Sequence, residues 1–321
     1  MPEQYTYAVA RIHAKEQEML SMQDMEQLLG CRNVAETIAM LADKGYECSD
    51  AANIDEIAKL RRDKMWKLIS ELVEDMSVFD VFLYENDFHN LKAAVKALVT
   101  KDNPEHVFVD NGTVGWQYIS DAVKTRQFEN LPPYMKDAAE KAVSYIFETG
   151  DGGFCDVIID KAYFNAIKAA GEKSENPLIR KYVEMIIAVS DIKIAARGCL
   201  LGKSIDFFRR SLAECETLNV SQLGNAAAKG FDDLCAFLSG TEYEKCVEML
   251  KVSNTAFEKW CDDILMNELK KEKYNQFGLS PIVAYMLACE TELKAVGLIL
   301  TGKQNKLDDN LVRERLRELY V

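Results

Sequence analysis

Three short stretches decide the fold, because they repeat one helical pattern: Asp87-Phe88-His89-Asn90-Leu91-Lys92, Asp191-Ile192-Lys193-Ile194-Ala195 and Glu292-Leu293-Lys294-Ala295-Val296. Each begins with an acid and continues with apolar, basic and small residues at helical spacing. The Leu/Ile–Lys pairs recur at an interval of 101 residues (192 − 91 and 293 − 192), and the acids at 104 and 101 (191 − 87 and 292 − 191). The two registers differ by three residues, close to one helical turn, so both keep the same helix face. This repeat predicts a body built from like parts, a design more often used to hold partners than to perform chemistry.

Outward from these markers, apolar periodicity predicts helix almost throughout and at most minor strands. Asn111-Gly112, Pro132-Pro133 and Gly150-Asp151-Gly152-Gly153 indicate turns. At Asn176-Pro177, Asn is expected to cap a helix with Pro in its first turn, and Ser280-Pro281 repeats the device. The expected helices cover residues 5–20, 53–76, 79–100, 114–127, 134–148 and 154–171, with two more starting at 177 and 281.

These helices group into modules of two long helices followed by two short ones. Met40–Tyr46 resembles Phe237–Tyr243, so residues 1–48 read as a partial module that lacks its first long helix. The expected division is therefore 1–48, 49–149 (module 1), 150–250 (module 2) and 251–321 (module 3, closing a ring). The predicted fold class is all-α, with three pseudo-symmetric repeats arranged around an axis as a funnel-shaped body.

Composition narrows the function classes. The 321-residue chain has a net charge of −13, which disfavours nonspecific binding to nucleic acid or anionic lipid. Its nine cysteines include no C-x-x-C pair, as expected of reduced thiols in a cytosolic protein. Met1-Pro2-Glu3-Gln4 lacks the plan of a signal peptide. The most apolar stretch, 281–300, is interrupted by Glu290, Glu292 and Lys294, so we expect no membrane span.

One glycine-rich segment comes close to a phosphate-binding loop. Gly198-Cys199-Leu200-Leu201-Gly202-Lys203-Ser204 is one residue short of the P-loop spacing, because the first glycine would have to stand at 197, which is Arg. A P-loop also follows a strand and opens a helix, whereas this segment is expected at the end of a long helix. Helix termination is the favoured interpretation.

Acid pairs and histidines give no catalytic pattern. Asp232-Asp233, Asp262-Asp263 and Asp308-Asp309 lack the further acid of the DDxxD magnesium motif, so a solvated face or a helix start is expected, with Asp308-Asp309 opening the last helix. His13, His89 and His106 fit no zinc spacing. His89 is expected to be a packed or capping histidine. We therefore expect no catalytic residue, no cofactor-binding residue and no metal ligand.

The markers and the C-terminus together resemble a known family. Ser280–Glu292, Gly297–Lys303 and the ending Val312–Val321 are similar to the C subunit of the V/A-type ATP synthases (V-type ATPases), and also to the d subunit of the eukaryotic vacuolar ATPases. Tyr84 with Asp87–Lys92 and the opening Tyr7–Arg11 fit as well, so the resemblance covers essentially the whole chain. The family's Asn three residues after each marker acid is present here only as Asn90, and Ile194 and Ala295 stand at the other two places.

The resemblance implies a non-catalytic rotor adaptor. One end of such a body receives the central shaft (the D and F subunits), and the other rests on the membrane rotor ring of proteolipid subunits. It transmits torque for proton or sodium transport, without cofactor or nucleic acid. The chain would then be cytoplasmic and peripheral on the membrane through the ring. Two alternatives remain: a cytosolic all-helical scaffold unrelated to ATPases, and a magnesium-dependent helical enzyme that uses Asp262 and Asp263.

Overall fold

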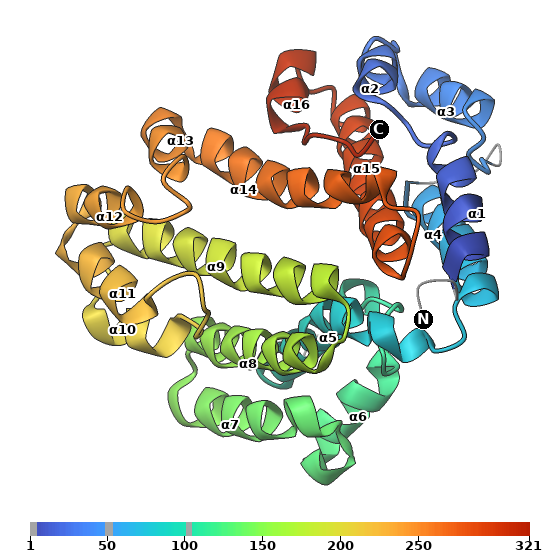
Figure 1. The fold of residues 1–321 in the computed structure, drawn as a ribbon. Coiled ribbons are helices and arrows are strands. Elements are labelled where there is room, and N and C mark those ends of the chain that lie inside the picture. The colour runs from blue at the N-terminus through green and yellow to red at the C-terminus, as the bar shows by residue number, and fades with distance from the viewer. Residues whose placement is uncertain (1–4, 49–53, 101–104) are drawn as a thin grey trace. The chain divides into compact units, whose positions relative to one another are not determined.

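The computed structural model describes residues 5–48, 54–100 and 105–321 (Figure 1). Within these ranges the chain forms sixteen α-helices and no strand, which confirms the all-α fold class. Met1–Gln4, named above for the absence of a signal peptide, lie outside the described residues, as does residue 53 at the expected start of one helix. The helices fall into two units of the chain.

The first unit combines the two ends of the chain, Met1–Met76 and Glu248–Val321, with the short segment Asn176–Tyr182. Its helices are α1 (Thr6–Glu16), α2 (Met22–Leu29), α3 (Val34–Asp43), α4 (Ile54–Leu72), α14 (Asn254–Leu269), α15 (Ser280–Gln304) and α16 (Asp309–Arg315), with a 3-10 turn η5 (Lys270–Tyr274). Two further helices have residues in both units: α9 (Pro177–Leu200) and α13 (Cys246–Val252).

Helix α15 is the centre of the first unit. It is apolar on nearly all sides, as expected of a helix buried within a protein rather than lying on its surface. Its residues Leu293, Val296 and Leu300 pack in one cluster with Leu28 of α2 and Leu41 of α3. The hydrophobic effect thus holds the beginning and the end of the sequence together.

The second unit comprises Ser77–Glu175 and Val183–Val247. Its helices, besides the greater part of α9, are α5 (Asp80–Thr100), α6 (Trp116–Thr125), α7 (Pro133–Thr149), α8 (Gly152–Lys173), α10 (Ile205–Ser211), α11 (Val220–Lys229) and α12 (Phe231–Leu238), with 3-10 turns η2 (Met76–Phe79), η3 (Glu105–Val107) and η4 (Phe128–Asn130). Helix α5 packs against α6, α7 and α8.

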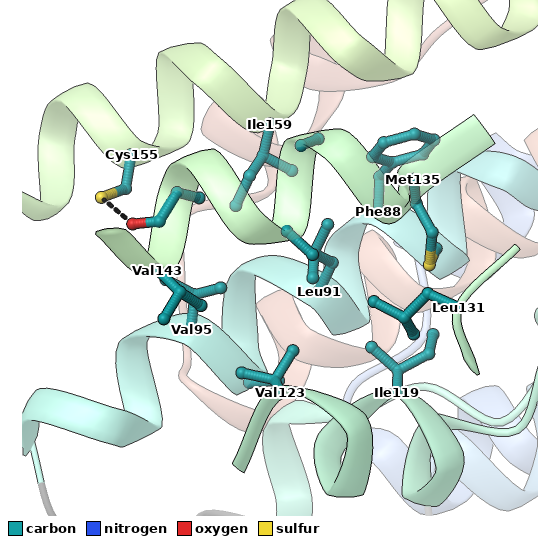
Figure 2. Packing of buried hydrophobic residues seen from close by; sticks show 14 of the residues in the cluster. Phe88, Leu91, Val95, Ile119, Val123, Leu131, Met135, Val143, Cys155 and Ile159 are labelled. Atoms are coloured by element: carbon teal, nitrogen blue, oxygen red, sulfur yellow. Dashed lines mark hydrogen bonds between the residues drawn. The ribbon is translucent and has the colours of Figure 1, made fainter. Parts of the chain in front are cut away.

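Apolar side chains from these four helices meet in one core. Figure 2 shows Leu91 of α5 between Val123 of α6, Val143 of α7 and Ile159 of α8. Phe88, which directly follows the first marker acid, is 2% exposed in the same cluster. The apolar part of the marker is therefore a core position, and the acid lies at the edge of that core.

Most predicted helix boundaries agree with the structure, and one predicted cap does not. Asn176 accepts a hydrogen bond from the Ile179 N–H (3.0 Å) at the start of α9, as expected of a cap. Pro281 stands in the first turn of α15, but the Ser280 side chain does not cap that helix. Its hydroxyl accepts a hydrogen bond instead from the side-chain amide of Asn176 (3.1 Å), which lies in the same unit.

Candidate functional site

The three marker acids are buried on the long helices α5, α9 and α15. Asp87 and Asp191 are 0% exposed and Glu292 is 1% exposed. Removing a carboxylate from water is costly unless other groups hydrogen-bond to it. We call these three side chains the anchor carboxylates, because each holds a distant segment of its own unit against its helix.

Asp87 holds the starts of two helices. Its Oδ2 accepts hydrogen bonds from the hydroxyls of Thr113 (2.6 Å) and Tyr134 (2.8 Å), and its Oδ1 accepts one from the Val114 N–H (3.3 Å). Val114 shortly precedes α6, and Tyr134 lies in the first turn of α7. Burial raises the pKa of Asp87, while the hydrogen bonds from Thr113 and Tyr134 act in the opposite direction.

Asn90 adds a second pair of bonds one turn further along α5. Its amide donates to the Val109 carbonyl (2.9 Å) and its side-chain oxygen accepts from the Val109 N–H (2.9 Å). Ile194 and Ala295 stand at the corresponding positions of α9 and α15 and cannot make such bonds. This hydrogen-bond role therefore belongs to the first marker alone.

Gly112 is the point of closest approach to the first anchor. A Cβ atom at this position would lie 2.2 Å from Asp87 Oδ1, well inside van der Waals contact. We expect Gly112→Ala to displace the carboxylate and to lower the free energy of unfolding by about 1–3 kcal/mol, the usual cost of overpacking. Chemical denaturation at equilibrium measures this loss.

The matched control is Gly297→Ala in the interior of α15. A Cβ there meets no atom within 4 Å, so the substitution is expected to be neutral or to stabilise by up to ~1 kcal/mol through helix propensity. Equal unfolding midpoints for the Gly112 variant and the wild type would show that the close approach has no energetic consequence.

Asp191 is the least satisfied of the three anchors. Its Oδ1 accepts a hydrogen bond from the Ala213 N–H (3.0 Å), in the segment between α10 and α11. Its Oδ2 is buried and has no hydrogen-bond partner among the described residues. Burial raises the pKa of Asp191 to about 8, so the side chain is mostly a neutral carboxylic acid at pH 7.

Two turns earlier on α9, Glu184 makes the bonds that Asp191 lacks. Its Oε1 accepts from the backbone N–H groups of Glu216 (2.8 Å) and Thr217 (2.8 Å) and from the Thr217 hydroxyl (2.7 Å). The Thr217 hydroxyl is also bonded to the Tyr243 hydroxyl (2.9 Å). The same chemical order, acid then threonine then tyrosine, occurs at the first anchor, where the two hydroxyls lie 2.7 Å apart. No signal in the sequence pointed to Glu184, because this residue does not stand at the position that the repeated marker defines.

Glu292 binds three groups from the first part of the chain. Its Oε2 accepts from the Leu20 N–H (2.6 Å), and its Oε1 accepts from the Tyr46 hydroxyl (2.6 Å) and from Arg61 Nη2 (3.3 Å). The Arg61 guanidinium lies over the Tyr46 ring, 4.9 Å from its centre. One buried carboxylate thus ties three positions from the first part of the chain to α15, near its end.

Further polar pairs reinforce the contact of the two chain ends. Arg62 on α4 forms a bidentate ion pair with Glu290 on α15 (2.7 and 2.9 Å). The Lys303 ammonium donates to the Leu29 carbonyl and to Asp309 (2.7 Å). A planar bidentate pair fixes geometry as well as charge, so the Arg62–Glu290 pair adds positional restraint to the hydrophobic cluster.

The three acid pairs have separate structural roles. Asp232 and Asp233 lie in the first turn of α12, and the Asp308 side chain caps α16, as predicted. Asp262 and Asp263 do not form a solvated face. Instead, Asp262 pairs with Arg317 (2.7 Å) and Asp263 accepts from the Glu318 N–H (2.8 Å), so they hold the C-terminal segment on α14.

The glycine-rich segment ends one helix and leads into the next. Helix α9 stops at Leu200, Gly202 has a positive φ of 61°, and the Lys203 N–H donates to the Gly198 carbonyl (2.9 Å). The Ser204 side chain then caps α10. This is the predicted helix end, and no strand precedes it in the described part of the chain.

The histidines differ in their surroundings. His89 was expected to be a packed or capping histidine. It is exposed rather than packed, and its Nε2 donates to the Val107 carbonyl (2.8 Å). His13 contacts two acceptors, Glu16 Oε2 through Nδ1 (2.7 Å) and the Asn275 carbonyl through Nε2 (3.0 Å). Burial opposes the charged ring, but these hydrogen bonds prevail and raise the pKa of His13.

Two features are missing from the described residues. Across 5–48, 54–100 and 105–321, no group of three or more His, Cys, Asp or Glu side chains is placed to hold a metal ion. In those same ranges, no helix combines the length and the apolar character needed to cross a bilayer.

This geometry defines a class of protein: an all-helical protein in which three long helices each carry a buried acid at a repeated position. The chain belongs to the ATP synthase (C/AC39) subunit family, whose model matches residues 8–315. It is 23% identical over 317 residues to the C subunit of the V-type sodium ATPase of Enterococcus hirae, covering 96% of this chain and 97% of that one.

Two further relatives agree. The C subunit of the A-type ATP synthase of Methanocaldococcus jannaschii is 23% identical over 352 residues, covering 99% of this chain and 86% of that one. The C subunit of the V-type ATP synthase of Thermus thermophilus is 24% identical over 319 residues, covering 95% of both chains. The resemblance carried by the markers and the C-terminus is thereby confirmed, and the chain is a subunit of a V/A-type rotary ATPase.

Proposed function

We propose that this subunit is the adaptor between the central shaft, formed by the D and F subunits, and the proteolipid ring of the membrane motor. It transmits torque between them, contributes no catalytic group, and is peripheral on the membrane through the ring. The modules 1–48, 49–149, 150–250 and 251–321 surround an axis in this proposal, with residues 1–48 completing the module that begins at 251.

The observation that carries the proposal, beside family membership, is the way the two ends of the chain are fastened. Glu292 on α15 binds Leu20, Tyr46 and Arg61, so load on either end passes into the same helix. A part that transmits torque has to resist shear, and closely packed helices with satisfied buried polar groups suit that task.

Joint purification tests the proposal. The tagged full-length chain, added to detergent-solubilised membranes and to purified shaft proteins, is expected to retain both the ring and the shaft. The isolated chain is expected to hydrolyse no ATP. Retention of neither partner would reject the adaptor role and leave the unrelated helical scaffold as the better description, while ATP turnover by the isolated chain would reject a non-catalytic role.

A further inference from the structure

A small cavity lies in the first unit between α1 and α4, with Tyr285 of α15 among its lining residues. Its volume is about 180 Å³. Both α1 and α4 pack against α15. Pockets for drug-sized ligands measure roughly 300–1,000 Å³, so this cavity suits a small ion or molecule.

The lining is cationic in a protein that is acidic as a whole. Five basic side chains and two acidic ones surround the cavity, together with Met65, Leu68 and Tyr285. The charged residues are Arg11, Lys15, Arg61, Lys64, Lys67, Glu18 and Glu71. Glu292 balances the charge of Arg61, and the other four cations still outnumber the two carboxylates. The protein as a whole carries a net charge of −13, so a positive electrostatic potential confined to this cavity favours the binding of an anion there.

The existing partners of these cations are weak competitors. Arg11 pairs with Glu71 at 3.3 Å, Lys15 with Glu18 at 2.5 Å and Lys64 with Glu47 at 3.5 Å. All six side chains are more than a third exposed. Exposed pairs of this kind contribute only ~0–1 kcal/mol, so an entering anion can replace them. Lys67 forms no ion pair with any residue that the structure describes.

Arg61 supplies the second, independent observation. Its side chain is 8% exposed, and its Nε is a buried donor without a hydrogen-bond partner in the described part of the chain. Leaving such a donor unsatisfied costs free energy that an acceptor in the cavity would recover. Arg61 also lines the cavity, so a small turn of its side chain would let an oxygen atom bound there reach this donor.

We propose that this cavity binds a small tetrahedral oxyanion of the phosphate class. Arg61 Nε donates to one oxygen of the anion, and Lys64 and Lys67 on the next turns of α4 supply charge from the same side. Arg11 and Lys15 on α1 face it from the opposite side. The site belongs to the isolated chain and does not depend on the adaptor role.

Titration calorimetry of the full-length chain with inorganic phosphate, at ionic strength held constant with chloride, tests this site. One saturable site is expected, with acetate binding more weakly. Lys64→Gln combined with Lys67→Gln is expected to weaken phosphate binding at least tenfold. Glu71→Gln removes a competing carboxylate and is expected to tighten it several-fold.

Lys59→Gln is the matched control, because Lys59 is an exposed lysine of α4 that does not line the cavity. It is expected to leave phosphate affinity unchanged. Absence of a saturable phosphate signal, equal affinity for acetate, or equal weakening by Lys59→Gln and by the Lys64/Lys67 double variant would each overturn the proposal. Circular dichroism verifies that the variants are folded, and none of these outcomes bears on retention of the shaft or the ring.

Discussion

Replacing Glu292 by alanine is expected to lower the free energy of unfolding by about 3–5 kcal/mol, because it leaves the charge of Arg61 buried without its partner. Glu292 is 1% exposed and Arg61 is 8% exposed, so water replaces the lost carboxylate poorly. The Leu20 N–H and the Tyr46 hydroxyl lose their acceptor in the same step. Urea unfolding followed by circular dichroism gives the measurement.

The neighbouring pair provides the matched control. Glu290 lies on the same helix and is paired with Arg62 through two shorter contacts (2.7 and 2.9 Å, against 3.3 Å for Arg61 with Glu292), but both side chains are 26% exposed. Glu290→Ala is therefore expected to cost less than about 1 kcal/mol. Equal losses for the two alanine variants would contradict the assignment of Glu292 as an anchor. In a double variant, Arg61→Leu with Glu292→Leu, part of the stability is expected to return, since no buried charge remains.

The second large effect is a fall in stability as the pH rises toward 8. The pKa of Asp191 is raised by burial to about 8 in the folded chain, against 3.8 as its ordinary value. Between these pH values the folded state holds a proton that the unfolded state has released. Stability therefore decreases with increasing pH across this window and levels off above it. From about pH 5 to about pH 9 the loss assignable to Asp191 is roughly 4 kcal/mol.

Asp191→Asn isolates this contribution, because an amide keeps the acceptor for the Ala213 N–H and does not ionise. The free energy of unfolding of this variant, relative to that of the wild type, is expected to increase between pH 5 and pH 9, because only the wild type loses stability over this range. Asp232→Asn, at an exposed position in α12, is expected to leave the pH profile of the wild type unchanged. A constant difference between the Asp191→Asn variant and the wild type over this range would show that Asp191 is already ionised at pH 5.

The helices were predictable, because burial imposes periodicity on the sequence itself. Residues 79–100 and 134–148 were expected to be helical, and α5 and α7 cover Asp80–Thr100 and Pro133–Thr149. Gly150 was expected in a turn, and it has a positive φ of 70°, a conformation that glycine adopts at little cost. The cap at Asn176 was identifiable for a similar local reason, whereas the apparent copy at Ser280 depended on a neighbour in space.

The partners of the anchor carboxylates could not be read from the sequence. Ala213 and Leu20 donate through the backbone, which every residue except proline offers, so no side-chain type marks them. The repeat identified Asp87, Asp191 and Glu292 as equivalent positions but not as buried ones. The cationic lining of the cavity could not be read from the sequence either, because it combines side chains of α1 and α4, which only the fold brings together.

A density map of the assembled ATPase tests the adaptor role most directly. It is expected to show this protein between the shaft and the ring, with its helix pairs arranged about an axis and the tip of the shaft entering the opening. A map that places the protein away from the axis of rotation, or that shows the opening filled by the chain's own side chains, would contradict the account.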